Sequence, residues 1–298
     1  MIASSKGNTA FVSKAIKEDQ RYLPVYQRLS ELCRFYDVDL RCLSETDVIW
    51  CRDYMPIQVT QNDFIRFNYN PSYLKGDPQS RPHVASIFWY ATRDWAKEKF
   101  SSIKLDGGNV ISNGNKTLMT SRIFEENPEF EKYKLIDELE LLLETEIIII
   151  PQVKSDVTGH VDGMVRFVDN DTLVGNHRQM EFKYWAKELN KVLRDNGLHY
   201  IDFPFSTEPN KNYPESAEGC YMNFLEISNF IFFPVFDLEM DEEALILMEQ
   251  IFPDRIIEPI KMNEVARYGG VLNCITWMVQ KPEPEQESEI PASDVLPF

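Results

Sequence analysis

Short runs of alternating hydrophobic and polar residues recur along the chain, and each is followed by turn residues and a second short hydrophobic run. This pattern predicts β-hairpins, because the side chains of a strand point alternately to its two faces. The clearest turn is Asn113-Gly114, since Asn-Gly favours the tight turns that join antiparallel strands. With the polar residues that precede them, the predicted hairpins are 53–59 with 64–67, 106–111 with 117–119, 162–168 with 172–174, and 223–227 with 230–233.

Hydrophobic residues spaced three and four apart predict helices after three of these hairpins. Gly197 is placed to end the second helix, and Asp241 to cap the start of the third. A short apolar strand is expected after each helix and before the next polar segment. The predicted helices are 129–144, 181–193 and 241–252, and the strands after them are 146–150, 199–203 and 255–259.

A repeat of about 55 residues links these elements. Its polar anchor residues, separated by 51 to 61 positions, are Asp53, Asp106, Asp162, Asn223 and Cys274. A period of this length indicates five βαβ-like units. The units could stack in a line as a solenoid, or close into a ring that points every anchor at one central axis. Coincidence among short strands is the alternative explanation.

Length and composition favour one compact domain over residues 1–280. The chain has 298 residues, of which 43% are hydrophobic and 27% charged, as in ordinary globular proteins. Residues 281–298 are acidic and rich in proline, which predicts a flexible or surface-wrapped tail. No apolar run is long enough to span a membrane, and the first residues lack a signal-peptide pattern, so we expect a cytoplasmic protein without membrane partners.

The net charge of −17 argues against a nucleic-acid partner, which requires a basic face. It fits a cationic ligand, although solubility alone also explains it. The five cysteines contain no CxxC pair, and no two of the four histidines have helix-ligand spacing. A disulfide framework or metal site is therefore not expected. The sequence is compatible with a homo-oligomer.

Cysteine, histidine and carboxylates gather in the polar segments. His160 and Asp162 are two residues apart on an apparent strand, so both face one side and suit acid–base work or cation binding. Cys274 follows the Gly269-Gly270 turn, where the backbone can pass close to a ligand. Each cluster also has a purely structural explanation, such as an ion pair, a turn or a buried thiol. Only their joint occurrence at a regular period favours function.

Five motifs occur in order along the chain. They are W-x-R-D-x-x-P from Trp50, D-G-G-N from Asp106, G-H-x-D-x-x-x-R-F from Gly159, Y-x-N-F from Tyr221 and G-G-x-x-x-C-I-T from Gly269. This set resembles the agmatine deiminase and bacterial peptidylarginine deiminase family of guanidino-group-modifying enzymes. The resemblance implies an α/β fold, the five-bladed α/β propeller or pentein fold, with ββαβ-type repeats around a central polar site.

The resemblance also implies roles for individual residues. Cys274 would be the nucleophile and His160 the general acid and base. Asp53 and Asp162 would clamp the guanidinium, and Asp106 would orient His160. Asp106 stands where similar agmatine deiminases usually carry Glu, and Asn273 where they commonly carry His. Further substrate-binding positions implied by the motifs are Trp50, Asn223, Arg166 and Gly270.

The resemblance implies hydrolysis of agmatine to N-carbamoylputrescine and ammonia, a step of putrescine biosynthesis. No metal or other cofactor is required, because side chains meet every role. A peptidyl- or free-arginine deiminase giving citrulline is an alternative. A non-catalytic protein that binds guanidino compounds or polyamines on the same fold is the alternative from another class.

Overall fold

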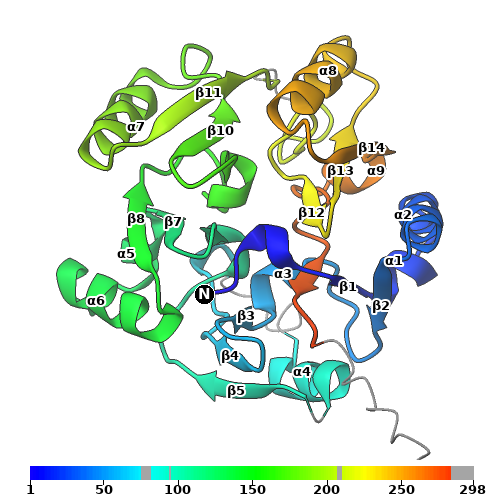
Figure 1. Cartoon of the computed structure of the whole chain (residues 1–298), viewed down its shortest axis with the longest axis horizontal. Helices are drawn as coiled ribbons and strands as arrows, with labels where there is room; N and C mark the ends of the chain where they lie inside the picture. The colour runs from blue at the N-terminus through cyan, green and yellow to red at the C-terminus, as the bar shows by residue number, and fades with distance from the viewer. Residues whose placement is uncertain (75–81, 94, 207–209, 283–298) are drawn as a thin grey trace, which may run out of the picture.

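The computed structural model describes residues 1–74, 82–93, 95–206 and 210–282. This part of the chain contains five three-stranded sheets, which lie around a common centre with their helices on the outside (Figure 1). In chain order of their middle strands, the sheets are β15 (Trp277–Val279) with β1 (Thr9–Ser13) and β2 (Asp39–Leu43); β3 (Ile57–Gln58), β4 (Asp63–Arg66) and β5 (Lys97–Phe100); β6 (Ile111–Ser112), β7 (Lys116–Thr120) and β8 (Glu146–Ile150); β9 (Val165–Phe167), β10 (Thr172–Asn176) and β11 (His199–Phe203); and β12 (Leu225–Ile227), β13 (Phe230–Val235) and β14 (Ile256–Lys261).

Every sheet has the same pairing. The middle strand is antiparallel to one neighbour and parallel to the other. The antiparallel pairs include all four predicted hairpins. A parallel pair needs a crossover, and a helix supplies it in each sheet. These helices are α2 (Leu23–Phe35), α4 (Val84–Thr92), α6 (Lys132–Leu143), α7 (Lys183–Asp195) and α8 (Asp241–Ile251).

Helix α7 shows how the sequence pattern becomes packing. Trp185, Leu189 and Leu193 lie one turn apart and are buried against the sheets. The indole nitrogen of Trp185 donates a hydrogen bond to the carbonyl of Pro151, so burial leaves no orphaned donor. Gly197 follows the helix with a φ of +63°, a conformation that favours glycine, and thus ends it as predicted.

Asp241 differs from its prediction. It is the first residue of α8, and the capping position before it is occupied by Met240, whose side chain makes no capping hydrogen bond. Its carboxylate instead accepts hydrogen bonds from the backbone nitrogens of Phe236 and Leu238 and from the hydroxyl of Tyr221. The acid therefore holds the loop that leads into the helix.

The fifth sheet joins the two ends of the described chain. Strand β15 follows the last polar anchor and pairs with β1, with Thr9 opposite Val279 and Phe11 opposite Trp277. The side chain of Asn8 exchanges two hydrogen bonds with the backbone of Lys281. The ring of sheets thus closes through residues far apart in the sequence. Most of the predicted tail at 281–298 lies outside the described residues.

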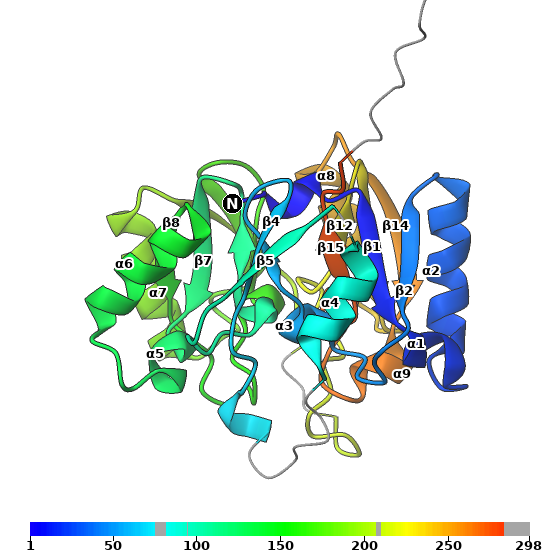
Figure 2. The same ribbon diagram turned by 90° about the horizontal axis from the view of Figure 1, so that it is seen from below.

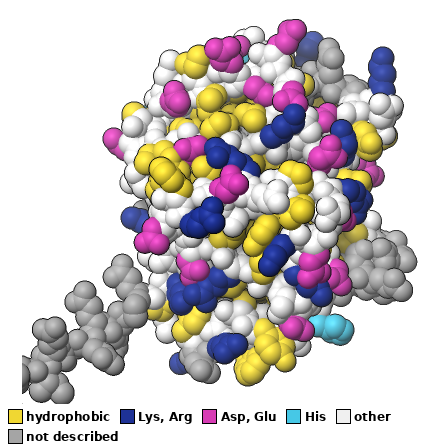
Figure 3. All heavy atoms as spheres, turned by 90° about the vertical axis from the view of Figure 1, so that its right-hand side faces the viewer, with side chains coloured by type: hydrophobic (Ala, Val, Ile, Leu, Met, Phe, Trp, Pro, Cys, Tyr) yellow, Lys and Arg dark blue, Asp and Glu magenta, His cyan; other side chains and the backbone are white. Residues whose placement is uncertain are grey.

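The side views complete the arrangement. Figure 2 shows α2 and α6 at opposite outer edges, with the strands between them. Acidic and basic side chains are interspersed over the face that carries α2 (Figure 3). Among the described residues, no helix is long and apolar enough to cross a membrane.

Candidate active site

The polar anchors lie where the chain enters the first strand of each sheet. Asp53 belongs to the short helix α3 (Cys51–Tyr54), and Asp106 precedes the 3-10 turn η4 (Gly107–Asn109). His160 precedes, and Asp162 belongs to, the turn η5 (Val161–Gly163). These single turns leave the regular backbone just before the strand, which lets their side chains reach the centre of the ring. Cys274 occupies the corresponding place before β15.

A cavity of about 850 Å³ opens at this end of the ring. Most of the residues singled out in the sequence line it. They are Trp50, Asp53, His160, Asp162, Asn223, Gly270 and Cys274. Asp106 is absent from this lining but lies directly behind His160 through a hydrogen bond. The structure thus brings together three carboxylates, one imidazole and the thiol of Cys274.

His160 lies between two carboxylates. Its Nε2 is 3.1 Å from Oδ2 of Asp106, and its Nδ1 is 3.5 Å from Oδ1 of Asp53. Burial disfavours the charged imidazole, but Asp53 and Asp106 outweigh burial and raise the pKa of His160 to about 10. His160 is therefore an imidazolium near neutral pH. Burial, together with the negative charges of Asp106 and Asp162, raises the pKa of Asp53 to about 7, although His160 opposes the rise.

Gly108 makes this approach possible. Its backbone nitrogen donates a hydrogen bond of 3.2 Å to Oδ1 of Asp53. A β-carbon at this position would lie 2.5 Å from Nδ1 of His160 and 2.6 Å from Oδ1 of Asp53. Any larger residue would push the acid and the imidazole apart, which accounts for the Gly in the D-G-G-N motif.

Cys274 faces the second carboxylate of the cavity. Its Sγ is 3.8 Å from Oδ2 of Asp162, and the same oxygen accepts a 2.6 Å hydrogen bond from the amide of Asn273. Burial and the negative charges of Asp162 and Asp53 raise the pKa of the Cys274 thiol well above its usual value. We therefore expect the Cys274 thiol to be protonated near neutral pH when no substrate is bound.

Asn223 fixes the backbone at Cys274. Its side-chain oxygen accepts a hydrogen bond from the Cys274 nitrogen at 3.2 Å, and its carbonyl accepts one from the Asn273 nitrogen at 3.1 Å. Gly270 allows close packing beside them. A β-carbon on Gly270 would lie 2.5 Å from the ring of Trp50 and 3.0 Å from Cβ of Cys274. Trp50 can thus lie against the loop that carries the thiol.

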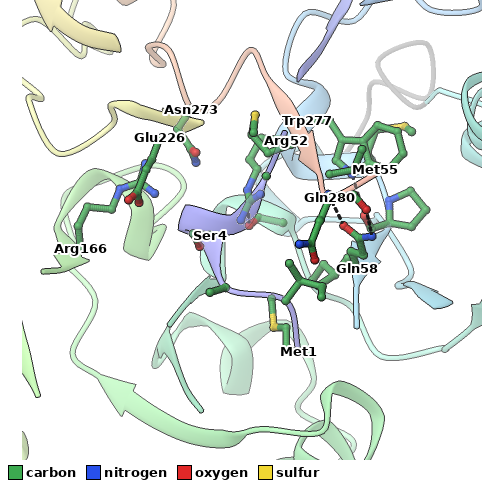
Figure 4. Close-up of a pocket in the computed structure, with 18 residues that line it drawn as sticks. Met1, Ser4, Arg52, Met55, Gln58, Arg166, Glu226, Asn273, Trp277 and Gln280 are labelled. Carbon is green, nitrogen blue, oxygen red and sulfur yellow. Dashed lines mark hydrogen bonds between the residues drawn. The ribbon is translucent and has the colours of Figure 1, made fainter. Parts of the chain in front are cut away.

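Arg166 lies outside the lining of the large cavity. It is 3% exposed, and its guanidinium donates hydrogen bonds of 2.8 and 2.7 Å to the carbonyls of Met222 and Phe224. It lines a separate cavity of about 50 Å³ (Figure 4), not the large one. Two of its five N–H donors bond to the backbone, so these contacts give Arg166 a structural role, and its role in substrate binding stays a prediction.

Arg52 makes similar contacts two repeats earlier. Its guanidinium donates to the carbonyls of Gly107 and Val110 at 3.0 and 2.8 Å. Arg52 and Arg166 each reach from one repeat to the polar segment of the next. The sequence analysis missed this role, although the Arg in both motifs and the repeat period were visible signals.

Tyr73 was missed entirely. It lines the large cavity, and its hydroxyl donates a 2.8 Å hydrogen bond to Oδ2 of Asp106. No motif or periodic pattern marks it in the sequence.

In the described residues, no group of three or more His, Cys, Asp or Glu side chains is arranged to hold a metal ion.

Solved structures share this fold. An agmatine deiminase from C. jejuni superposes with a TM-score of 0.77 at 18% identity, covering 94% of this chain and 95% of the other. An agmatine deiminase from Enterococcus faecalis gives 0.73 at 18% identity, with 94% and 95% covered. At this identity the likeness shows the fold alone, a mixed α/β fold.

Curated sequences are also similar. A Photobacterium profundum protein named "Putative agmatine deiminase" is 23% identical over 211 residues, which are 60% of this chain and 58% of that protein. The chain thus spans less than two thirds of the curated relatives it matches. The family of Porphyromonas-type peptidyl-arginine deiminases matches residues 3–282. The chain belongs to this family.

Proposed function

We propose that the protein hydrolyses a guanidino group to a ureido group and releases ammonia through a covalent intermediate on Cys274. One observation carries the proposal: a thiol, an imidazolium and carboxylates converge on one cavity, with Sγ of Cys274 3.8 Å from Asp162 and His160 held between Asp106 and Asp53. We also propose that the five sheets are the blades of a pentein propeller with this cavity at its axis.

The carboxylates suit a guanidinium ion. This planar cation presents its N–H donors in a fork that matches carboxylate oxygens. Asp53 and Asp162 both line the cavity, so a guanidinium bound between them would place its carbon beside Cys274. Holding the carbon there lowers the barrier, because delocalised charge makes it a poor electrophile.

The reaction then follows from the charge states. Bound guanidinium neutralises the carboxylates, so Cys274 releases its proton to solvent, because His160 is already protonated. The Cys274 thiolate then forms a bond to the guanidinium carbon. His160 gives its proton to one nitrogen of the tetrahedral adduct, and the carbon–nitrogen bond breaks to release ammonia. Neutral His160 removes a proton from water, which attacks the remaining thiouronium carbon. The carbon–sulfur bond breaks to leave the Cys274 thiolate, which takes the proton of the new hydroxyl group and so gives the ureido product and the free thiol.

Charge favours agmatine as the substrate, giving N-carbamoylputrescine for putrescine biosynthesis. Among the described residues that line the cavity, Arg21 is the sole Arg or Lys, and Asp19 and Tyr268 already bind its guanidinium. The α-carboxylate of free arginine would find no unpaired cation there. The amine of agmatine would instead meet acidic residues such as Glu181 and Glu218.

Cavity size favours a second candidate. About 850 Å³ is spacious for a small diamine derivative, since pockets of this size enclose drug-sized ligands. A peptidyl-arginine substrate, giving peptidyl-citrulline, would use this space and carries no free α-carboxylate when the arginine is internal. A protein that binds guanidino compounds without turnover is the candidate from another class.

A colorimetric ureido assay separates these candidates. We expect product from agmatine, little from free arginine, and no product with the Cys274→Ala variant. Faster turnover of an arginine peptide than of agmatine would shift the substrate to peptidyl-arginine. No product from any of the three, with agmatine binding seen by calorimetry, would refute the hydrolase and support the binding protein.

A further inference from the structure

Tyr73 contacts the residue behind the imidazole. Its hydroxyl donates to Oδ2 of Asp106 at 2.8 Å, and the same oxygen is 3.1 Å from Nε2 of His160. The Tyr73 and His160 rings approach edge to face, with centroids 6.2 Å apart. Burial and the charge of Asp106 raise the pKa of Tyr73, so its hydroxyl stays a donor. Tyr73 and His160 thus share one carboxylate oxygen.

Contacts from helix α5 (Arg122–Glu126) hold the turn that carries Tyr73. Tyr73 lies in the turn η2 (Ser72–Leu74), and both the nitrogen and the hydroxyl of Ser72 donate to the carboxylate of Glu126. Glu126 ends helix α5. Arg122 completes the contact, because it binds both Glu126 and the Ser72 hydroxyl and lies 5.9 Å from the centre of the Tyr73 ring.

Asn127, the residue after Glu126, holds the segment that leads to Asp106. The side chain of Asn127 accepts a 2.8 Å hydrogen bond from the nitrogen of Lys104 and donates one of 2.8 Å to its carbonyl. Lys104 is two residues before Asp106. Adjacent residues, Glu126 and Asn127, therefore each clamp one of the two segments. This pair therefore connects the segments of Tyr73 and Asp106 through contacts other than those of the cavity side chains.

We propose that Tyr73 is a positioning residue that acts through Asp106 and limits how strongly Asp106 stabilises the His160 imidazolium. The proposal rests on the proposed function for its kinetic effect, because His160 is the acid and base there. The contact itself does not depend on that function.

The direction of the effect follows from the neighbouring charges. His160 is faced by Asp53 from α3, Asp106 before η4 and Asp162 from η5. Tyr73 is faced by Asp106, Asp53 and Tyr69, and Arg122 of α5 lies beside its ring. Without the Tyr73 hydroxyl, Oδ2 of Asp106 would interact with His160 alone. The pKa of His160 would then rise, and the imidazolium would release its proton less readily.

The test is Tyr73→Phe in the full chain, with Tyr22→Phe as the matched control. Tyr22 lines the same cavity but packs on Tyr268, away from Asp106. Nitrogen NMR of the His160 ring should show a pKa about one unit higher in Tyr73→Phe. The alkaline limb of the rate profile should move up with it, and kcat should fall about tenfold with KM changed less than about twofold. Tyr22→Phe should leave the pKa of His160 and the position of the alkaline limb unchanged.

Glu126→Gln provides a second variant that keeps the Tyr73 hydroxyl. It weakens the clamp on Ser72, and we expect a smaller shift of the same sign. Glu125→Gln is its control, since Glu125 lies on the same helix and bonds to Gln152 instead. An unmoved His160 pKa in both Tyr73→Phe and Glu126→Gln would overturn the proposal, as would a loss of kcat equal at every pH.

The two hypotheses fail separately. Wild-type protein that turns over no guanidino compound would refute the proposed function, while the NMR titration of His160 would still decide the role of Tyr73. If Tyr73→Phe does not fold, the Glu126→Gln titration decides alone.

Discussion

The charge state of Cys274 can be tested by removing the carboxylate nearest to it. In Asp162→Asn the negative charge 3.8 Å from Sγ disappears. Two unit charges at 3.8 Å interact by about 4 kcal/mol at an effective dielectric constant of about 20, which corresponds to about 3 pKa units. The amide of Asn273 already shares this charge, so about 3 units is an upper limit. We expect the pKa of Cys274 to fall by about 1 to 3 units in the empty enzyme.

The assay is the pH dependence of Cys274 alkylation by an uncharged reagent. Cys42 and Cys220 are not buried, so both are replaced by alanine in the parent, while buried Cys33 and Cys51 keep their packing. A Cys274→Ala version of the parent gives the background rate. The parent should react slowly near pH 7, and Asp162→Asn should reach its maximal rate at a lower pH.

A non-reacting guanidine analogue extends the test. The bound cation should neutralise the carboxylates and lower the pKa of Cys274, which ultraviolet absorbance of the thiolate reports separately from steric blocking. A thiolate already complete at pH 6 in the empty parent would show that the imidazolium of His160 outweighs both carboxylates. That result, or an Asp162→Asn variant with an unchanged or higher pKa, would refute the reasoning.

Three further predictions concern turnover of the guanidino substrate. Cys274→Ala should abolish activity measured by ammonia release, whereas alanine at Cys33, Cys42 or Cys220 should preserve it; near-normal activity in Cys274→Ala would contradict the mechanism. Activity should survive EDTA, because side chains meet every assigned role, and loss that zinc or magnesium restores would argue against it. Asn273→Ala should lower kcat/KM about 10- to 100-fold through loss of the 2.6 Å bond to Asp162, and a change below twofold would exclude that role.

Local patterns predicted most of the elements. The alternation around Asn113-Gly114 became β6 and β7, and the stripe of Leu135 and Leu139 became α6. These signals are local, because strand and helix periods are written into neighbouring residues. The pairing of β1 with β15 was not predicted, since it joins residues about 270 positions apart and no local pattern specifies it.

The residues of the cavity also include some that the repeat indicated and others that no local pattern indicated. The repeat indicated that three residues would lie at the centre, because each opens a repeat of similar length: Asp53, Asp162 and Cys274. The cavity that Arg166 lines could not be predicted, because Arg166 lies in the same motif as Asp162 yet points to a different cavity. Tyr73 could not be predicted, since the contacts of Glu126 with Ser72 place it and nothing in the sequence pairs those segments.

The central claim is that Cys274 forms a covalent bond to the guanidino carbon, and intact-protein mass spectrometry of acid-quenched turnover tests it most directly. With agmatine, or whichever panel compound is turned over, we expect an adduct with the mass of the substrate less ammonia. Peptide mapping should place it on Cys274, and the adduct should be absent from Cys274→Ala. An adduct on another residue, or product formed by Cys274→Ala, would contradict the account.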